Sequence, residues 1–112
     1  MPFTIAHAIP ILDELTSTLD KAYWEVSSVT AKDAIYDCFS TVSKELLELN
    51  KLSIQDHDLI YEPISYEFKS MTRRLPIFRK NLDNYITRII TLETLDNVIS
   101  STIQLISQEK AQ

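Results

Sequence analysis

Apolar residues recur every three or four positions along most of the chain, the spacing that places them on one face of an α-helix. In the first segment a stripe of apolar residues runs from Ile5 to Val26 in steps of three or four residues. A half-buried strand would alternate with a period of two, and this segment does not. The pattern therefore predicts an amphipathic helix whose buried stripe is Ile5, Ile9, Leu12, Leu15, Leu19, Tyr23 and Val26.

A second helix is predicted to start at Thr30, which suits an N-cap, and to end at Asn50, which tolerates the left-handed conformation. The connection 51–53 is short, which favours antiparallel neighbours. The third segment contains Pro63, and proline disrupts a helix interior. Either this helix kinks there, or a short helix ends near Tyr61 and another begins with Pro63 in its first turn.

Pro10 and Pro76 can likewise each lie in the first turn of a helix. A fourth segment follows Pro76, and a fifth opens around Thr91. The isoleucine-rich run Tyr85–Leu92 is the one serious candidate for a strand, because β-branched residues favour sheets. No partner strand is visible, so we interpret this run as two buried helix ends. The pattern predicts an all-α fold: a single domain over 1–112, an antiparallel bundle of four to five helices with breaks near Pro63 and Pro76.

Composition excludes several chemistries. The 112 residues include no glycine, so the chain has no phosphate-binding P-loop, dinucleotide-binding turn or nucleophile elbow. Cys38 is the one cysteine, so no internal disulfide forms, and on the apolar stripe of the second helix it is expected to be a small buried hydrophobe. No signal peptide and no apolar run long enough for a bilayer is visible, so we expect a cytoplasmic protein without membrane contact.

Metal binding is not expected either. The run 56–58, Asp-His-Asp, places adjacent side chains about 100° apart on a helix, so they do not converge on one ion. Neither His7 nor His57 has a glutamate three residues before it, as di-iron bundles require. Glu45 and Glu48 belong on a polar outer face. We therefore expect no catalytic residue, metal or cofactor, and no enzyme activity.

Charge is distributed unevenly along the chain. The net charge is −5 in all. By residue counts it is −8 over 1–67, +5 over 68–90 and −2 over 91–112. The basic segment either forms a patch for nucleic acid or a phosphate-bearing ligand, or packs beside the acidic helices and is neutralised by them. The acidic whole chain disfavours nucleic acid. The candidate binding residues of this alternative, within 69–88, are Lys69, Arg73, Arg74, Arg79 and Lys80.

Several aromatic residues fall outside the core stripes. Tyr23 belongs to the first stripe, so the neighbouring Trp24 points about 100° away from it. Tyr36 and Tyr66 lie beside the second and third stripes in the same way. Such residues either anchor an interface or cover the edges of the bundle. The candidate protein contacts are Trp24, Tyr36, Tyr61 and Tyr66, with an acidic rim of Asp56, Asp58 and Glu62.

The stretch 58–63, Asp-Leu-Ile-Tyr-Glu-Pro, resembles the Asp-Leu-Ile-Tyr-Tyr-Pro stretch of the nuclease-colicin immunity proteins. Those proteins are small acidic helical bundles that bind and block a cognate nuclease. The resemblance implies a toxin contact at Tyr61, whereas Glu62 replaces the second tyrosine of the family. We therefore expect a non-enzymatic interaction protein, acting as an adaptor, regulator or inhibitor on an unidentified protein partner, with a homodimer as the commonest form of self-association.

Overall fold

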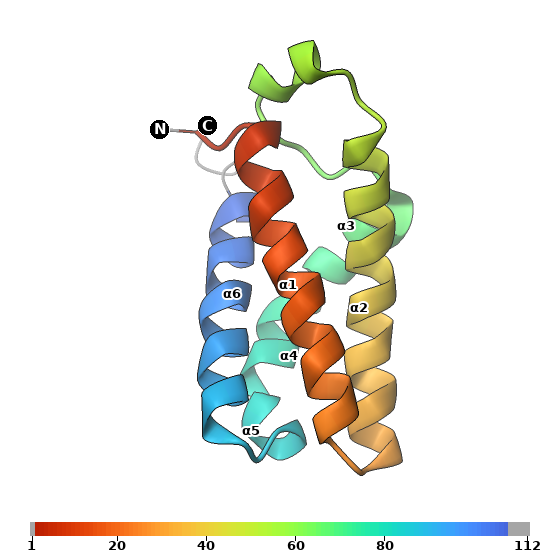
Figure 1. Ribbon diagram of the computed structural model, residues 1–112, viewed down its shortest axis with the longest axis vertical. Helices are drawn as coiled ribbons and strands as arrows, with labels where there is room; N and C mark the ends of the chain where they lie inside the picture. The colour runs from red at the N-terminus through yellow and green to blue at the C-terminus, as the bar shows by residue number, and fades with distance from the viewer. Residues whose placement is uncertain (1, 108–112) are drawn as a thin grey trace.

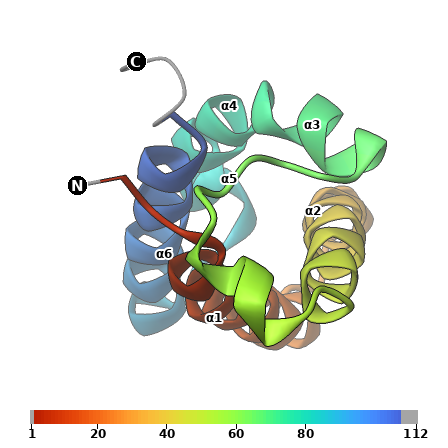
Figure 2. The ribbon, with the colours of Figure 1, turned by 90° about the horizontal axis from the view of Figure 1, so that it is seen from above.

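Three long helices run along the long axis of the molecule, and three short helices close the side between two of them (Figures 1 and 2). The computed structural model describes residues 2–107. Its helices are α1 Ile5–Glu25, α2 Val29–Asn50, α3 Tyr66–Thr72, α4 Leu75–Lys80, α5 Leu82–Tyr85 and α6 Ile89–Ser107, with a 3-10 helix, η1, at Ile54–Asp58. No strand occurs over 2–107, where the one β-bridge joins Thr4 and Ile60. The all-α prediction is confirmed.

The starts of the long helices follow from local hydrogen bonds. The Thr4 N–H donates to Nδ1 of His7 over 3.0 Å, which satisfies a backbone donor at the start of α1. Oγ of Ser28 accepts a bond from the Ala31 N–H over 3.0 Å, so α2 begins at Val29. The predicted N-cap at Thr30 is therefore wrong by two residues. The helix does end at Asn50 as predicted, but not through a left-handed residue, because Lys51, which follows, has φ −80°.

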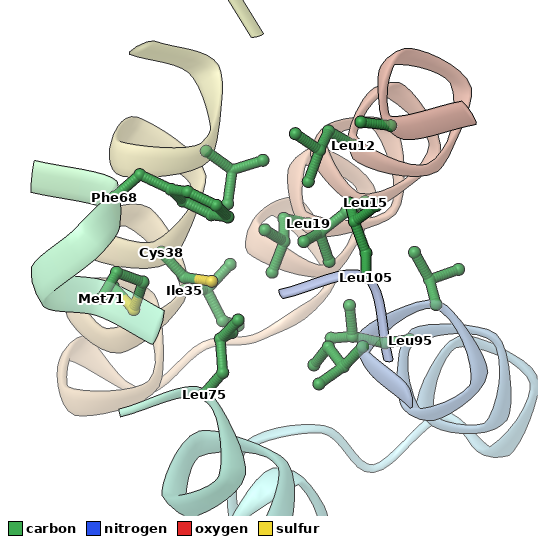
Figure 3. Close-up of a cluster of buried hydrophobic side chains, with 14 of the residues drawn as sticks. Leu12, Leu15, Leu19, Ile35, Cys38, Phe68, Met71, Leu75, Leu95 and Leu105 are labelled. Carbon is green, nitrogen blue, oxygen red and sulfur yellow. The ribbon is translucent and has the colours of Figure 1, made fainter. Parts of the chain in front are cut away.

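The core lies between α1, α2, α6 and the short helices (Figure 3). α1 runs antiparallel to both α2 and α6, which flank it in Figure 1. The predicted first stripe is confirmed, with Leu12, Leu15 and Leu19 fully buried. The other labelled side chains of Figure 3 come from the surrounding elements: Ile35, Cys38, Phe68, Met71, Leu75, Leu95 and Leu105.

The chain between α2 and α3 departs from the predicted helix. η1 ends at Asp58, and the following residues are extended until Ser65 caps α3 by accepting a bond from the Phe68 N–H over 3.1 Å. The segment 59–61 pairs with the chain before α1, where the N–H groups of Ile5 and Tyr61 donate to the carbonyls of Leu59 and Phe3 over 3.0 Å each. The break near Pro63 is confirmed, but Pro63 lies in extended chain and starts no helix.

The predictions for the other prolines and for the later helices are confirmed in part. Pro76 lies in the first turn of α4, as predicted, whereas Pro10 lies inside α1 and not at its start. The fourth predicted segment divides at Asn81 into α4 and α5. The run Tyr85–Leu92 forms no strand, and α6 begins at Ile89 instead of Thr91. The prediction that its helix ends are buried is wrong for Ile89 and Ile90, which are exposed at the start of α6. These divisions raise the number of α-helices within 2–107 to six, above the four to five predicted.

Candidate functional site

An aromatic pocket lies on the outer face of the α1–α2 pair, at the end where the two helices are joined. Trp24 and Tyr36 both line it, with side chains that are 74% and 58% exposed. Tyr23 connects them, since its ring lies 5.2 Å from the Trp24 ring in an edge-to-face arrangement and 6.2 Å from the Tyr36 ring. Phe39 adds a fourth ring, 6.3 Å from Tyr36. The structure thus brings two predicted contact residues to one site.

The pocket has a volume of about 260 Å³ and an acidic edge. Asp20 lines it from α1, one helical turn before Trp24. Within residues 2–107 the carboxylate of Asp20 has no ion pair within 4 Å. An acidic side chain therefore lines the aromatic pocket without an ion-pair partner among these residues.

Lys32 already places a cation over two of these rings. Its ammonium lies 4.3 Å from the centroid of the Tyr23 ring and 5.6 Å from that of Trp24. The same ammonium donates a hydrogen bond to the Tyr23 carbonyl over 2.7 Å. Cations suit the carboxyl end of a helix, and α1 has no basic residue of its own in its last turn. Lys32 therefore holds the start of α2 against the end of α1.

A shallow groove continues from the pocket along α1 and α2. Asp20 and Phe39 line both, and the groove runs past Leu47 to Asn50. From Tyr36 to Asn50 the helix rises about 21 Å, at about 1.5 Å per residue. We call this surface, with its pocket, the α1–α2 groove; it is lined by Thr16, Ser17, Asp20, Tyr23, Trp24, Tyr36, Phe39, Ser43, Leu46, Leu47 and Asn50.

Tyr61 does not belong to any exposed surface. Its side chain is 1% exposed, and its hydroxyl donates to Oε2 of Glu45 over 2.6 Å. Glu45 is fully buried and also accepts the N–H groups of Ile64 and Ser65 over 2.8 Å each. The prediction of Tyr61 as a protein contact is therefore wrong, because the extended chain turns this ring inward to reach a buried carboxylate.

The remaining predicted contacts lie elsewhere. Asp58, Glu62 and Tyr66 are exposed, and half-buried Asp56 accepts a hydrogen bond from the hydroxyl of Ser53 over 3.2 Å. η1 lies beyond the end of α2 that is far from the Trp24 pocket, and the segment after it returns beside α2, where Ile64 and Ser65 donate to Glu45 (Figure 1). The predicted acidic rim therefore does not surround the pocket. The chain from η1 to α3 also leaves Ile54, Leu59, Ile60 and Ile64 exposed.

The basic segment is partly neutralised by the acidic helices. Arg74 donates to Asp37 on α2 over 2.9 Å, and Arg79 donates to Asp96 on α6 over 2.8 Å. The Arg79–Asp96 hydrogen bond lowers the pKa of the Asp96 carboxyl and raises that of the guanidinium.

Two of the other cations share a cleft. Lys69 and Arg73 line a cleft of about 590 Å³ between α3, α4 and the end of α6, and Glu62 lines it too. Lys69, Arg73 and Lys80 have no ion pair within 4 Å among residues 2–107. Three of the five predicted cations are therefore unpaired in this part of the chain, and two of them line one site.

Cys38 is buried, as its place on the stripe of the second helix predicts. Burial, with a smaller effect from Asp37, raises the pKa of the Cys38 thiol to about 12, so the thiol stays protonated and is a poor nucleophile. Within 2–107 no three His, Cys, Asp or Glu side chains gather as a metal site. None of the helices in this range combines the length and apolar character needed to cross a membrane.

No protein-family model, curated protein or solved structure matches this chain. The resemblance of 58–63 to the nuclease-colicin immunity proteins therefore stays confined to those six residues. In the structure they form the end of η1 and extended chain, with the matching tyrosine buried.

Proposed function

We propose that the protein is a non-enzymatic protein-binding module whose binding surface is the α1–α2 groove. The observation that carries the proposal is the exposure of Trp24 and Tyr36 on one pocket that continues into a groove ending at Leu47 and Asn50. Tryptophan and tyrosine dominate the binding energy of protein interfaces. A groove about 21 Å long suits an amphipathic helix of about 14 residues.

Affinity capture with matched variants tests this function. Wild-type protein, the double variant Trp24→Ala/Tyr36→Ala and the control Ile77→Ala, which removes an exposed apolar side chain on α4, are each immobilised and exposed to extract of the producing cells. We expect a protein that the wild type and the control retain and the double variant loses. The captured protein is then purified and its affinity measured by calorimetry, where the double variant should bind at least about 30-fold more weakly. Equal binding by all three would contradict the proposal.

A second copy of the chain is one form that this partner can take. Homodimers are the commonest oligomers, and their interface uses the same surface on both copies. Light scattering on the purified protein measures this directly, since a monomer has a mass of 12.9 kDa. A dimer that Trp24→Ala/Tyr36→Ala dissociates would identify the partner as a second copy. We keep the cytoplasm as the proposed location, because Cys38 is a free thiol.

A second candidate function is the binding of a phosphate-bearing ligand in the cleft of Lys69 and Arg73. The observation that favours it is that both cations line this cleft and neither is paired within 2–107. Binding of inorganic pyrophosphate or a short oligonucleotide should weaken with salt and be lost in Lys69→Glu/Arg73→Glu. Binding that ignores salt, or persists in that variant, would contradict this function.

A further inference from the structure

The aromatic pocket at the closed end of the α1–α2 groove has the composition of a cation-binding site. Tyr23, Trp24, Tyr36 and Phe39 contribute four rings around about 260 Å³, and Asp20 contributes a carboxylate at the edge. A cation over an aromatic face is attracted by the electrons of the ring, most strongly over tryptophan. A purely apolar partner side chain would leave Asp20 without a charged partner.

The molecule itself shows that these rings accept a cation. The Lys32 ammonium lies 4.3 Å from the Tyr23 centroid and 5.6 Å from that of Trp24. Lys32 is held there by the Tyr23 carbonyl and does not line the pocket. The pocket therefore offers a second cation site beside Tyr23 and Trp24, and this site includes the carboxylate of Asp20.

We propose that the pocket takes the guanidinium of an arginine on the protein partner, stacked on the aromatic rings and paired with Asp20. This inference rests on the proposed function and deepens it, because it assigns the partner an arginine. Guanidinium is planar, so it stacks on tyrosine and tryptophan while its edge gives two N–H groups to one carboxylate. Lysine has a compact, strongly hydrated charge that does neither as well. A quaternary ammonium has no N–H for Asp20.

The chain around the pocket is mainly acidic, although Lys32 already places one cation over Tyr23 and Trp24. Residues 1–67, which include α1 and α2, carry twelve acidic and four basic residues. Asp13 lies two helical turns before Asp20 on the same side of α1, at the spacing of seven residues. A partner segment with arginine at the pocket and further bases beside it would meet charges of opposite sign along this surface.

NMR on the intact protein tests the proposal. Trp24 is the one tryptophan of the chain, so its indole N–H gives a single, assigned signal inside the pocket. The probe is arginine blocked at both ends, N-acetyl-arginine methylamide. The comparison probes are the blocked lysine, the blocked citrulline, which has the same shape without the charge, and tetramethylammonium. Two variants are matched in charge: Asp20→Asn removes the carboxylate of the pocket, and Asp13→Asn removes one outside it.

We expect blocked arginine to shift the Trp24 indole signal saturably, blocked lysine to bind at least about threefold more weakly, and citrulline to cause no saturable shift. Asp20→Asn should weaken arginine binding at least about fivefold, and Asp13→Asn by less than about twofold. Equal binding of citrulline, tighter binding of tetramethylammonium, or full binding by Asp20→Asn would overturn the inference.

The two proposals fail separately. If arginine does not bind but a captured partner still requires Trp24 and Tyr36, the arginine assignment is wrong and the binding function stands. If arginine binds saturably but no partner depends on those rings, the pocket chemistry stands and the binding function is wrong.

Discussion

At the residue scale, Glu45 is a charged residue on the buried stripe of a helix, and its burial was not predicted. The prediction placed it with Glu48 on a polar outer face, but Glu45 is fully buried. Its position is three residues after Val42 and four before Leu49, so it continues the buried stripe of α2. Its partners, which include the Tyr61 hydroxyl, come from a segment 16 to 20 residues away, and spacing along α2 does not reveal them.

Replacing Glu45 tests how firmly this carboxylate holds the extended segment. Glu45→Ala removes the acceptor of the Tyr61 hydroxyl and of the Ile64 and Ser65 N–H groups. We expect the free energy of unfolding to fall by about 3 kcal/mol, because buried donors are left unpaired. Chemical denaturation measures this. Glu48→Ala, which removes an exposed partner of Lys51, is the control and should change it by less than about 1 kcal/mol.

The candidate site was predictable in part. Trp24 and Tyr36 could be predicted as exposed because they lie beside core stripes, and the structure confirms that exposure. Asp20 and Phe39 were missed as site residues, although Asp20 lies four residues before Trp24 and Phe39 lies three after Tyr36. Those spacings place each pair on one face of its own helix. The spacing of residues within one helix does not show which face of α1 packs against which face of α2.

At the element scale, the long helices were predictable and the short segments were not. α1, α2 and α6 each repeat a helical stripe over about 20 residues, so their pattern is unambiguous. The segment 59–65 has apolar residues at helical spacing, yet it is extended. Its conformation depends on the bonds of Leu59 and Tyr61 with the chain before α1 and on Glu45, all distant in sequence.

Pro10 gives a test of helix propensity within α1. It lies at the sixth residue of that helix, where it cannot donate to the carbonyl four residues earlier, that of Ala6. Pro10→Ala restores the donor at an exposed position. We expect the free energy of unfolding to rise by about 1–2 kcal/mol, less than the full interior penalty, because alanine also frees the unfolded chain. An unchanged or lower denaturation midpoint would show that α1 is not strained there.

The Arg79–Asp96 pair joins α4 to α6 and gives a prediction of pH dependence. Its hydrogen bond lowers the pKa of Asp96 in the folded state. The stabilisation is therefore complete above the ordinary aspartate pKa and is lost as the pH falls through the lowered value. Asp96→Asn should be less stable than wild type at pH 7, and the gap should close on acidification. Because both side chains are well exposed, the gap is small. A gap that widens below pH 4 would contradict this account.

At the scale of the whole molecule, the basic cleft and the aromatic pocket are lined by different elements. The basic segment packs against the acidic helices through Arg74 and Arg79, while Lys69 and Arg73 line a cleft of their own. The neutralising interpretation of this segment therefore holds for Arg74 and Arg79, and ligand binding by Lys69 and Arg73 stays a prediction. The aromatic pocket lies at the opposite end of α2 from η1. The residues that we predicted as one contact patch therefore lie in two separate places.

Site-specific cross-linking tests the central claim most directly. A photoreactive benzoylphenylalanine replaces Tyr36 in the pocket or, as a control, the exposed Ile77 on α4. Irradiation of the producing cells should give one discrete protein adduct from position 36, none from position 77, and none from position 36 when Trp24→Ala is added. The absence of any adduct at position 36, or the same adducts from both positions, would contradict a protein-binding role for the α1–α2 groove.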